Sequence, residues 1–277
     1  MKKASKKKIV ITGGKGLLGS NFYFKYKRQY NIIRYPNRIE HFSKFHKWLK
    51  NKNFDYFIRF AALTKSESIK RRKNLNLINV KSTLNLIKSI NKESIKDFKY
   101  FLFISSSHVY GTSSKKIKEN RKTNPKNLYG ISKKKVEDHI LKNRNKYKFK
   151  IGIARVFNVT GPKQKIGNFV PDMKRKIKKN DFIDNVNHYR DFIHIDDVME
   201  AIILLIKKEF YKPINISSGK KINLIQVCKI INQTYFKKKI TFGKTRGSDL
   251  YGDNELLKSI GKIRFKNINQ IIKSFKN

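Results

Sequence analysis

The stretch KIVITGGKGLLG, residues 8–19, runs directly into an apolar segment with helical spacing. Its first five residues contain the apolar run Ile9-Val10-Ile11 and are mostly β-branched, which is typical of a short buried strand. A strand, a glycine-rich turn and a helix in this order can bind phosphates, because the helix N-terminus presents unpaired N–H groups. We expect Gly13 to permit the tight turn, Gly16 to admit a pyrophosphate and Gly19 to allow close helix packing. The alternative is a glycine turn without a ligand. The candidate cofactor residues of this stretch are Gly13, Gly16, Leu17, Leu18 and Gly19.

Apolar segments that could form strands recur along the chain and are separated by stretches with helical spacing. This alternation predicts an α/β protein with a parallel, doubly wound sheet. Pro162 begins a loop-like stretch that leaves this core, and the pattern returns near residues 190–206. A smaller C-terminal lobe is expected to complete the chain. The expected strands lie at about residues 8–12, 31–34, 55–62, 99–106 and 150–157.

The sequence YGISK at residues 129–133 follows a serine cluster, Ser105–Ser107, after about 22 residues. Tyr129 and Lys133 are four residues apart and therefore share one face of a helix. A neighbouring ammonium stabilises a phenolate and lowers a tyrosine pKa from its ordinary value of about 10. Such a tyrosine can exchange protons near neutral pH. Tyrosine and lysine abound in this chain, so the alternative is an ordinary solvated helix face.

Together, the glycine turn, the segment SSSHVYG at residues 105–111 and YGISK resemble the extended short-chain dehydrogenase/reductase family. This family contains nucleotide-sugar epimerases, dehydratases and reductases. The resemblance covers nearly the whole chain, because further motifs match in order. These are residues 55–62, 79–86, 155–162, 190–198, 213–219 and 246–249.

The resemblance implies a division of the chain and a set of site residues. Residues 1–160, with about 188–206, would form an NAD(P)-binding Rossmann domain, and about 161–187 and 207–277 a nucleotide-sugar-binding lobe. The implied catalytic residues are Ser106, Tyr129 and Lys133. Tyr129 and Lys133 also bind the cofactor, together with Arg34, Ala61, Ala62 and Asn79. The candidate substrate-binding residues are Ser107, His108, Asn158, Arg190 and Arg246. His108 could exchange a proton or only bind a sugar hydroxyl, and His194 is expected to be structural.

The end of the second expected strand, residues 32–38, concerns the choice of cofactor. Enzymes that use NAD usually have an acidic residue there, which binds the adenosine ribose. This chain has no acid in that segment but has Arg34 and Arg38, which favours NADP(H) over NAD(H). The alternative is that both arginines belong to the general cationic excess.

By resemblance, the chemistry is hydride transfer at a sugar carbon, C4 in most relatives, on a nucleotide-diphosphate sugar. Dehydratases have an Asp-Glu pair where this chain has Ser107 and His108, so dehydration is disfavoured. A reductase of 4-keto-6-deoxy sugar nucleotides is favoured, and a UDP-hexose 4-epimerase is the alternative. From another class, a noncatalytic dinucleotide-binding or RNA-binding protein is also considered, because the chain is basic.

Composition limits the other classes of function. The formal net charge is +47 over 277 residues, but the lysines are spread along the chain and no specific nucleic-acid site is expected. No apolar run is long enough for membrane insertion. The basic start, residues 1–8, lacks the features of a secretory signal, so a cytoplasmic location is expected. The single cysteine, Cys228, is expected to be buried, and no metal site is predicted. Homodimers are common among relatives, but no interface can be identified.

Overall fold

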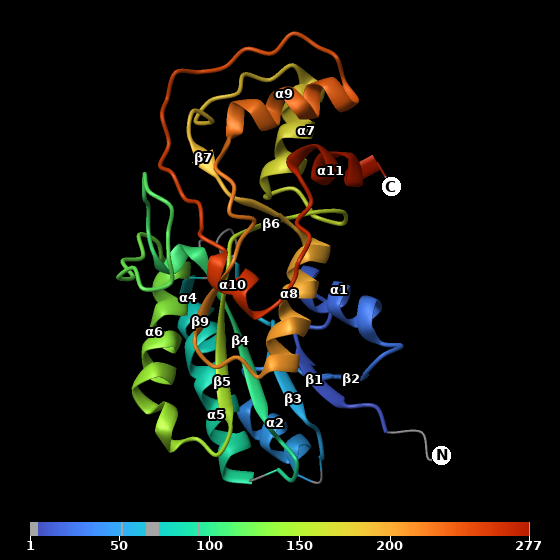
Figure 1. The fold of residues 1–277 in the computed structure, drawn as a ribbon, viewed down its shortest axis with the longest axis vertical. Coiled ribbons are helices and arrows are strands. Elements are labelled where there is room, and N and C mark those ends of the chain that lie inside the picture. Colours follow the sequence, from blue (N-terminus) through green and yellow to red (C-terminus); the bar gives the residue numbers. More distant parts are fainter. Residues whose placement is uncertain (1–4, 51, 65–71, 94, 277) are drawn as a thin grey trace.

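The computed structural model describes residues 5–50, 52–64, 72–93 and 95–276, so residues 1–4 of the basic start lie outside it. Six parallel strands form one sheet in the order β2-β1-β3-β4-β5-β9 (Figure 1). The strands are β1 (Lys8–Thr12), β2 (Asn31–Arg34), β3 (Tyr56–Arg59), β4 (Tyr100–Ser106), β5 (Lys150–Val156) and β9 (Pro213–Ile216). The five strands expected from the sequence are confirmed, with ends that differ by up to three residues.

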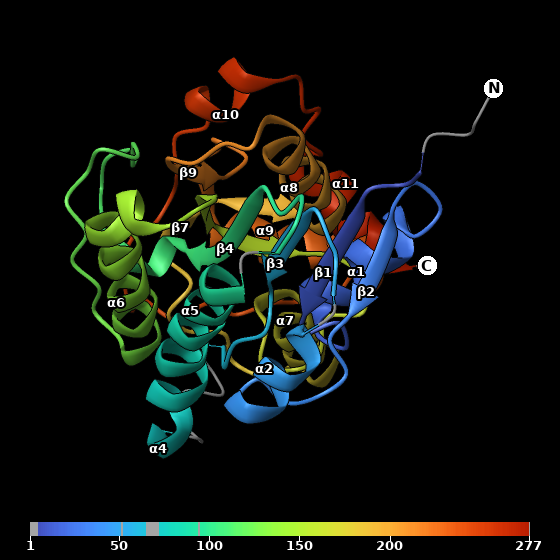
Figure 2. The same ribbon diagram turned by 90° about the horizontal axis from the view of Figure 1, so that it is seen from below.

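Side chains alternate between the two faces of the sheet, as the geometry of a strand requires. In β4, Tyr100, Leu102 and Ile104 enter one core, whereas Phe101 and Phe103 enter the other. The first core is covered by α1 (Leu17–Tyr26) and α8 (Ile195–Lys208), and the second by α2 (Phe42–Leu49), α5 (Ser82–Glu93) and α6 (Leu128–Asn143). Figure 2 shows α8 and α2 on opposite sides of the strands. The predicted doubly wound α/β fold is therefore confirmed.

The strand β9 corrects the expected division of the chain. It pairs with β5 in parallel, and its Ile214 and Ile216 are fully buried in the first core. Helix α10 (Glu255–Ile260) adds Leu257 to the same core. The expectation that residues 207–277 all belong to the lobe is thus wrong for these two elements. A four-residue apolar run does not reveal from sequence alone which sheet it joins. Elsewhere the division stays a prediction.

The lobe has its own apolar core at the other end of the molecule (Figure 1). Helices α7 (Phe169–Lys179), α9 (Leu224–Tyr235) and α11 (Ile268–Lys273) build it. Cys228 is fully buried there, as expected. Two small sheets lie between the lobe and the main sheet. They pair β7 (Tyr189–Arg190) with β10 (Ile222–Asn223), and β6 (Asn158–Thr160) with β8 (Phe192–His194).

The remaining elements are short or irregular helices. They are α4 (Arg72–Leu75), a π-helix η1 (Asn76–Lys81), and the 3-10 turns η2 (Ser107–Val109), η3 (Arg144–Lys146) and η4 (Ser274–Lys276). Over the described ranges, no helix combines the length and apolar character needed to cross a membrane. The same ranges contain no cluster of histidine, cysteine and acidic residues that could hold a metal ion.

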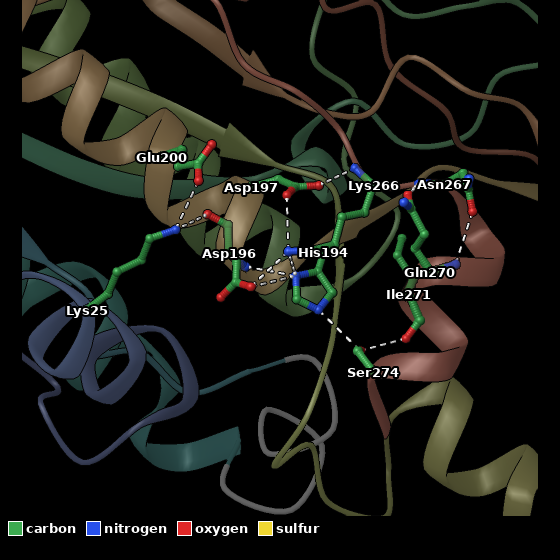
Figure 3. A network of polar contacts seen from close by, with 10 residues as sticks. All are labelled: Lys25, His194, Asp196, Asp197, Glu200, Lys266, Asn267, Gln270, Ile271 and Ser274. Carbon is green, nitrogen blue, oxygen red and sulfur yellow. Dashed lines mark hydrogen bonds and ion pairs between the residues drawn. The ribbon is translucent and has the colours of Figure 1, made fainter. Parts of the chain in front are cut away.

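His194 joins the sheet domain to the C-terminal helix through a polar network (Figure 3). Its Nδ1 accepts a hydrogen bond from the Asp196 amide at 3.2 Å and lies 3.0 Å from the Lys266 Nζ. Its Nε2 lies 3.2 Å from the Ser274 hydroxyl. Burial, reinforced by Lys266, lowers the pKa of His194 to about 4. A neutral imidazole in this position fits the structural role expected for His194.

Candidate active site

The glycine turn lies where the ends of β1 and β3 meet. Gly13 has φ +71°, a left-handed conformation that favours glycine, and a Cβ there would come within 2.6 Å of the Ala61 amide nitrogen. A Cβ on Gly19 would lie 2.3 Å from the Gly13 carbonyl oxygen. By contrast, a Cβ on Gly16 would meet only that same oxygen, at 3.3 Å. A side chain at position 16 would thus be tight against one oxygen but meet no other atom of the chain, which leaves room for a pyrophosphate to approach.

The position of this turn in the sheet suits a dinucleotide. Strand order reverses between β1 and β3, and ligands of doubly wound sheets bind at such a switch point beyond the strand ends. Leu17 and Leu18 are the first residues of α1, and Gly16 caps this helix without a side chain. The first amide groups of a helix lack partners within it and bind anions readily. Ala61 and Ala62 follow β3 and are half-buried beside the turn.

Arg34 ends β2 and lies across the glycine turn. A Cβ added to Gly14 would meet the Arg34 Cδ at 2.8 Å, so the arginine side chain passes directly over this glycine. The Arg34 guanidinium stacks on Tyr23 of α1, with 4.3 Å from its carbon to the ring centroid. Arg38 is also exposed, but no contact links it to the turn. Arg34 is thus held as an exposed cation next to the glycine turn.

Ser106 ends β4 and caps the 3-10 turn η2. Its Oγ accepts a hydrogen bond from the His108 amide at 3.3 Å, and the side chain is buried. A hydroxyl both donates and accepts, so this contact leaves its hydrogen able to donate to another oxygen. Ser107 is buried in the same turn, whereas His108 is only half-buried.

Helix α6 begins directly against this turn and brings Tyr129 to it. A Cβ on Gly130 would lie 2.4 Å from the His108 carbonyl oxygen, so glycine permits the close approach. The rings of His108 and Tyr129 meet edge to face, with 5.8 Å between their centroids. Tyr129 is half-buried and stands next to the serine turn. The local sequence motif and the fold together therefore place these side chains at one spot.

Lys133 lies one turn deeper on α6. Its Nζ donates a 2.7 Å hydrogen bond to the Ile104 carbonyl of β4 and lies 5.7 Å from the Tyr129 ring centroid. The side chain is buried. Burial first, and then the positive charge of Arg59, lower the pKa of Lys133 to about 7. The fraction of Lys133 that is protonated near neutral pH therefore depends strongly on any anion that lies near it.

Asn79 bonds to the chain itself through both ends of its amide. Its Oδ1 accepts from the Leu63 amide at 2.8 Å, and its Nδ2 donates to the Leu63 carbonyl and to the Ser132 hydroxyl, each at 3.0 Å. It thereby fastens the segment after β3 to α6. Cofactor contact by Asn79 stays a prediction.

The predicted substrate residues lie mainly around the two small sheets. Arg190 donates through Nη1 to the Tyr189 carbonyl at 2.9 Å and to the Ser248 carbonyl. Asn158 donates to the Asp191 carbonyl at 2.9 Å. These bonds bring the segment around Arg190 together with Asn158 and residues 246–249. Arg246 itself is exposed and makes no contact that ties it to the others.

Three further residues of the site were not among the candidates, although Arg59 and Asp191 lie within the motifs at residues 55–62 and 190–198. Asn127 caps α6, Arg59 is buried beside Lys133, and Asp191 accepts hydrogen bonds from Ser218 and the Gly219 amide. Asn127 could have been found as a capping residue just before YGISK. For the other two, the motifs around them did not reveal a role, because their partners lie far away along the chain.

A glycine turn at the switch point, with a serine, a tyrosine and a lysine brought together at the end of β4, is the arrangement expected of a dinucleotide-dependent oxidoreductase. The chain belongs to the NAD dependent epimerase/dehydratase family, whose model matches residues 9–217. Its relatives include proteins named as nucleotide-sugar dehydrogenases, epimerases and reductases, and solved structures of the same fold hold NAD or NADPH.

One curated relative is the GDP-6-deoxy-D-talose 4-dehydrogenase of Aggregatibacter actinomycetemcomitans, 29% identical over 81% of this chain and 79% of the relative. Among solved structures, RMD from Pseudomonas aeruginosa, complexed with NADPH, has a TM-score of 0.84 at 20% identity over 97% of each chain. UDP-glucose 4-epimerase from Thermotoga maritima, with UDP-glucose, has a TM-score of 0.85 at 21% identity over 97% of this chain and 98% of that one. At this identity, the two structures show the common fold.

Proposed function

We propose that the protein is an NADP(H)-dependent reductase that acts at C4 of a 4-keto-6-deoxy sugar attached to a nucleoside diphosphate. The observation that carries the proposal is the convergence of Ser106, Tyr129 and Lys133 at the end of β4. The name of the talose relative supports redox chemistry at C4. Membership of this enzyme family speaks against a noncatalytic dinucleotide- or RNA-binding role.

The side chains of this cluster suit proton transfer to a sugar oxygen. A nicotinamide bound beyond the glycine turn would supply the hydride to the carbonyl carbon. As the carbonyl oxygen gains the electron pair, Tyr129 gives it the phenolic proton, and the same proton returns in the oxidative direction. The Ser106 hydroxyl donates a hydrogen bond to that oxygen. Lys133 in its charged form stabilises the tyrosine phenolate.

Arg34 supports the choice of NADP(H). It is an exposed guanidinium fixed by Tyr23 over the phosphate-binding turn, and no acidic residue stands beside it in residues 31–38. A guanidinium forms strong, paired hydrogen bonds with a phosphate.

The epimerase remains the second candidate, because a putative UDP-glucose 4-epimerase from Methanocaldococcus jannaschii is 26% identical over 88% of each chain.

The test is oxidation of GDP-6-deoxy-D-talose, followed by nicotinamide absorbance with NADP⁺ and with NAD⁺. Turnover with preference for NADP⁺ supports the proposal. Tightly retained NAD together with interconversion of UDP-hexoses would instead establish the epimerase. Other nucleotides carrying the same sugar are tested next, because the base is not specified by any contact described above.

The Arg34→Ala variant tests the cofactor preference. We expect kcat/KM for NADPH to fall about tenfold, the effect of one lost charged hydrogen bond, while the value for NADH changes less than about twofold. Arg28→Ala removes an equal, exposed charge beyond the end of α1 and serves as the control. Equal losses in both variants would show that general charge, and not a phosphate contact, is responsible.

A further inference from the structure

Asn127 has both ends of its side-chain amide engaged, which fixes its orientation. Its Oδ1 accepts from the Gly130 amide at 2.9 Å and thereby caps α6. Its Nδ2 lies 3.2 Å from Nδ1 of His108. A flipped amide would set its NH₂ group against the Gly130 N–H, two donors facing each other. The capping bond therefore decides that a donor faces the histidine ring.

The tautomer of His108 follows from this orientation. A donor on Asn127 requires an acceptor at Nδ1, and a neutral imidazole with an acceptor at Nδ1 carries its proton on Nε2. Protonation of both nitrogens would place the new N–H against the Asn127 NH₂ group. The pair thus favours the neutral ring with Nε2–H over both the other tautomer and the imidazolium.

The His108 ring lies next to the proposed catalytic residues. It meets the Tyr129 ring edge to face at 5.8 Å, and the His108 backbone amide is held by the catalytic Ser106. The titratable groups of α6 on this side are Tyr129 and, one turn deeper, Lys133. His108 is thus in contact with both Ser106, through its backbone, and Tyr129, through its ring.

We infer that Asn127 is a positioning residue that holds His108 as an Nε2–H hydrogen-bond donor toward an oxygen of the substrate sugar. His108 is then a specificity-determining residue and not a proton acceptor. The ligand group it fits is an acceptor oxygen, a ketone or a hydroxyl, on or next to the carbon at which Tyr129 acts. This inference rests on the proposed function only for the identity of the ligand.

Nitrogen NMR of the imidazoles in labelled protein with NADPH bound tests the tautomer without turnover. The chain has six histidines, and His108→Gln identifies the signal of His108. At about pH 8, where an ordinary histidine is neutral, we expect the proton of His108 on Nε2. A proton on Nδ1 would overturn the inference. This result does not depend on which sugar nucleotide the enzyme uses, so it separates failure here from failure of the proposed function.

Asn127→Asp provides the kinetic test. Aspartate caps helices as well as asparagine does, but it offers His108 an acceptor and moves the proton to Nδ1. We expect kcat/KM for the sugar nucleotide to fall about tenfold at about pH 8, and to recover toward lower pH as the ring becomes doubly protonated and donates again.

Asn127→Ser is the matched control, because serine keeps the cap but is too short to reach the ring. We expect a smaller loss whose ratio to the wild type does not change with pH. A ratio for Asn127→Asp that is equally flat across pH would overturn the inference. Unchanged unfolding temperatures in both variants would show that the helix cap is preserved.

Discussion

Lys133 and Glu137 lie one turn apart on the same buried face of α6, but only the charge of Glu137 is compensated by an ion pair among the described residues. Glu137 is paired with Arg155 through contacts of 2.7–3.3 Å, and the Ser105 hydroxyl also donates to it. Lys133 donates to the neutral carbonyl of Ile104 and has no ion pair within the described part of the chain. The comparison separates a charge that stabilises the fold from a charge that is available for chemistry.

Arg59 adds a second positive charge near Lys133 and so increases the difference in charge compensation between Lys133 and Glu137. It is buried near Lys133, and only its Nη2 has partners, at Ile78 and Ser82, while Nε and Nη1 have none among the described residues. Glu137 acts on Lys133 and Glu40 acts on Arg59 only from a distance, and no direct ion pair of either cation is found among the described residues. Two buried cations in this situation favour any anion that approaches them. A tyrosine phenolate or a dinucleotide phosphate is such an anion. Around Glu137, by contrast, burial costs are offset by complete pairing.

The largest effect is expected from Tyr129→Phe, which removes the proposed proton donor near the start of α6 and leaves the Glu137 pair intact. Turnover should fall about 10³-fold, the usual contribution of a general acid or base. Affinity for NADPH, measured by fluorescence titration, should change by less than about threefold. A variant that retains a rate within about tenfold of the wild type would refute the assignment of Tyr129.

The Glu137→Gln variant removes the ion pair with Arg155 and leaves the Arg155 guanidinium buried without its carboxylate. Loss of one partner of a buried pair costs about 3–5 kcal/mol of unfolding free energy, which urea denaturation measures. Lys134→Ala on the same helix is the control, because it breaks only the partly exposed contact with Asp138. That variant should lose less than about 1 kcal/mol. Similar losses in the two variants would mean that the buried pair is not stabilising.

A smaller effect should appear in the pH dependence of stability for Lys133→Met. The pKa of Lys133 is about 7 in the folded chain and 10.5 ordinarily, so between these values the unfolded chain binds more protons. Stability of the wild type should therefore gain up to about 1.4 kcal/mol per pH unit from this lysine as pH rises from about 7 to 9.

The methionine variant should lack that part of the slope, which urea denaturation at both pH values would reveal. Its other charged groups are unchanged, so subtraction of the two curves isolates Lys133. Equal slopes for wild type and variant would show that the lysine is not destabilised by burial and by Arg59.

Local patterns account for what could be predicted. The β-branched run at residues 8–12, the glycines after it and the spacing of Tyr129 and Lys133 depend on near neighbours in the chain. The predicted sheet is confirmed for that reason. The expected boundary at residue 207 was wrong because the pairing of β9 with β5 joins segments about sixty residues apart. Homodimer formation and a cytoplasmic location stay predictions.

By itself, the sequence determined the class of fold, the glycine turn after the first strand and the candidate residues Ser106, Tyr129 and Lys133, because strand and helix periodicity and turn chemistry are local. Only the tertiary structure decided which charges are compensated. Arg155 meets Glu137 across 18 positions and Arg59 meets Ser82 across 23. The donor role inferred for His108 likewise depends on a contact with Asn127, 19 positions away. Packing of distant elements sets burial and hydrogen-bond partners, and these set the chemistry of a side chain.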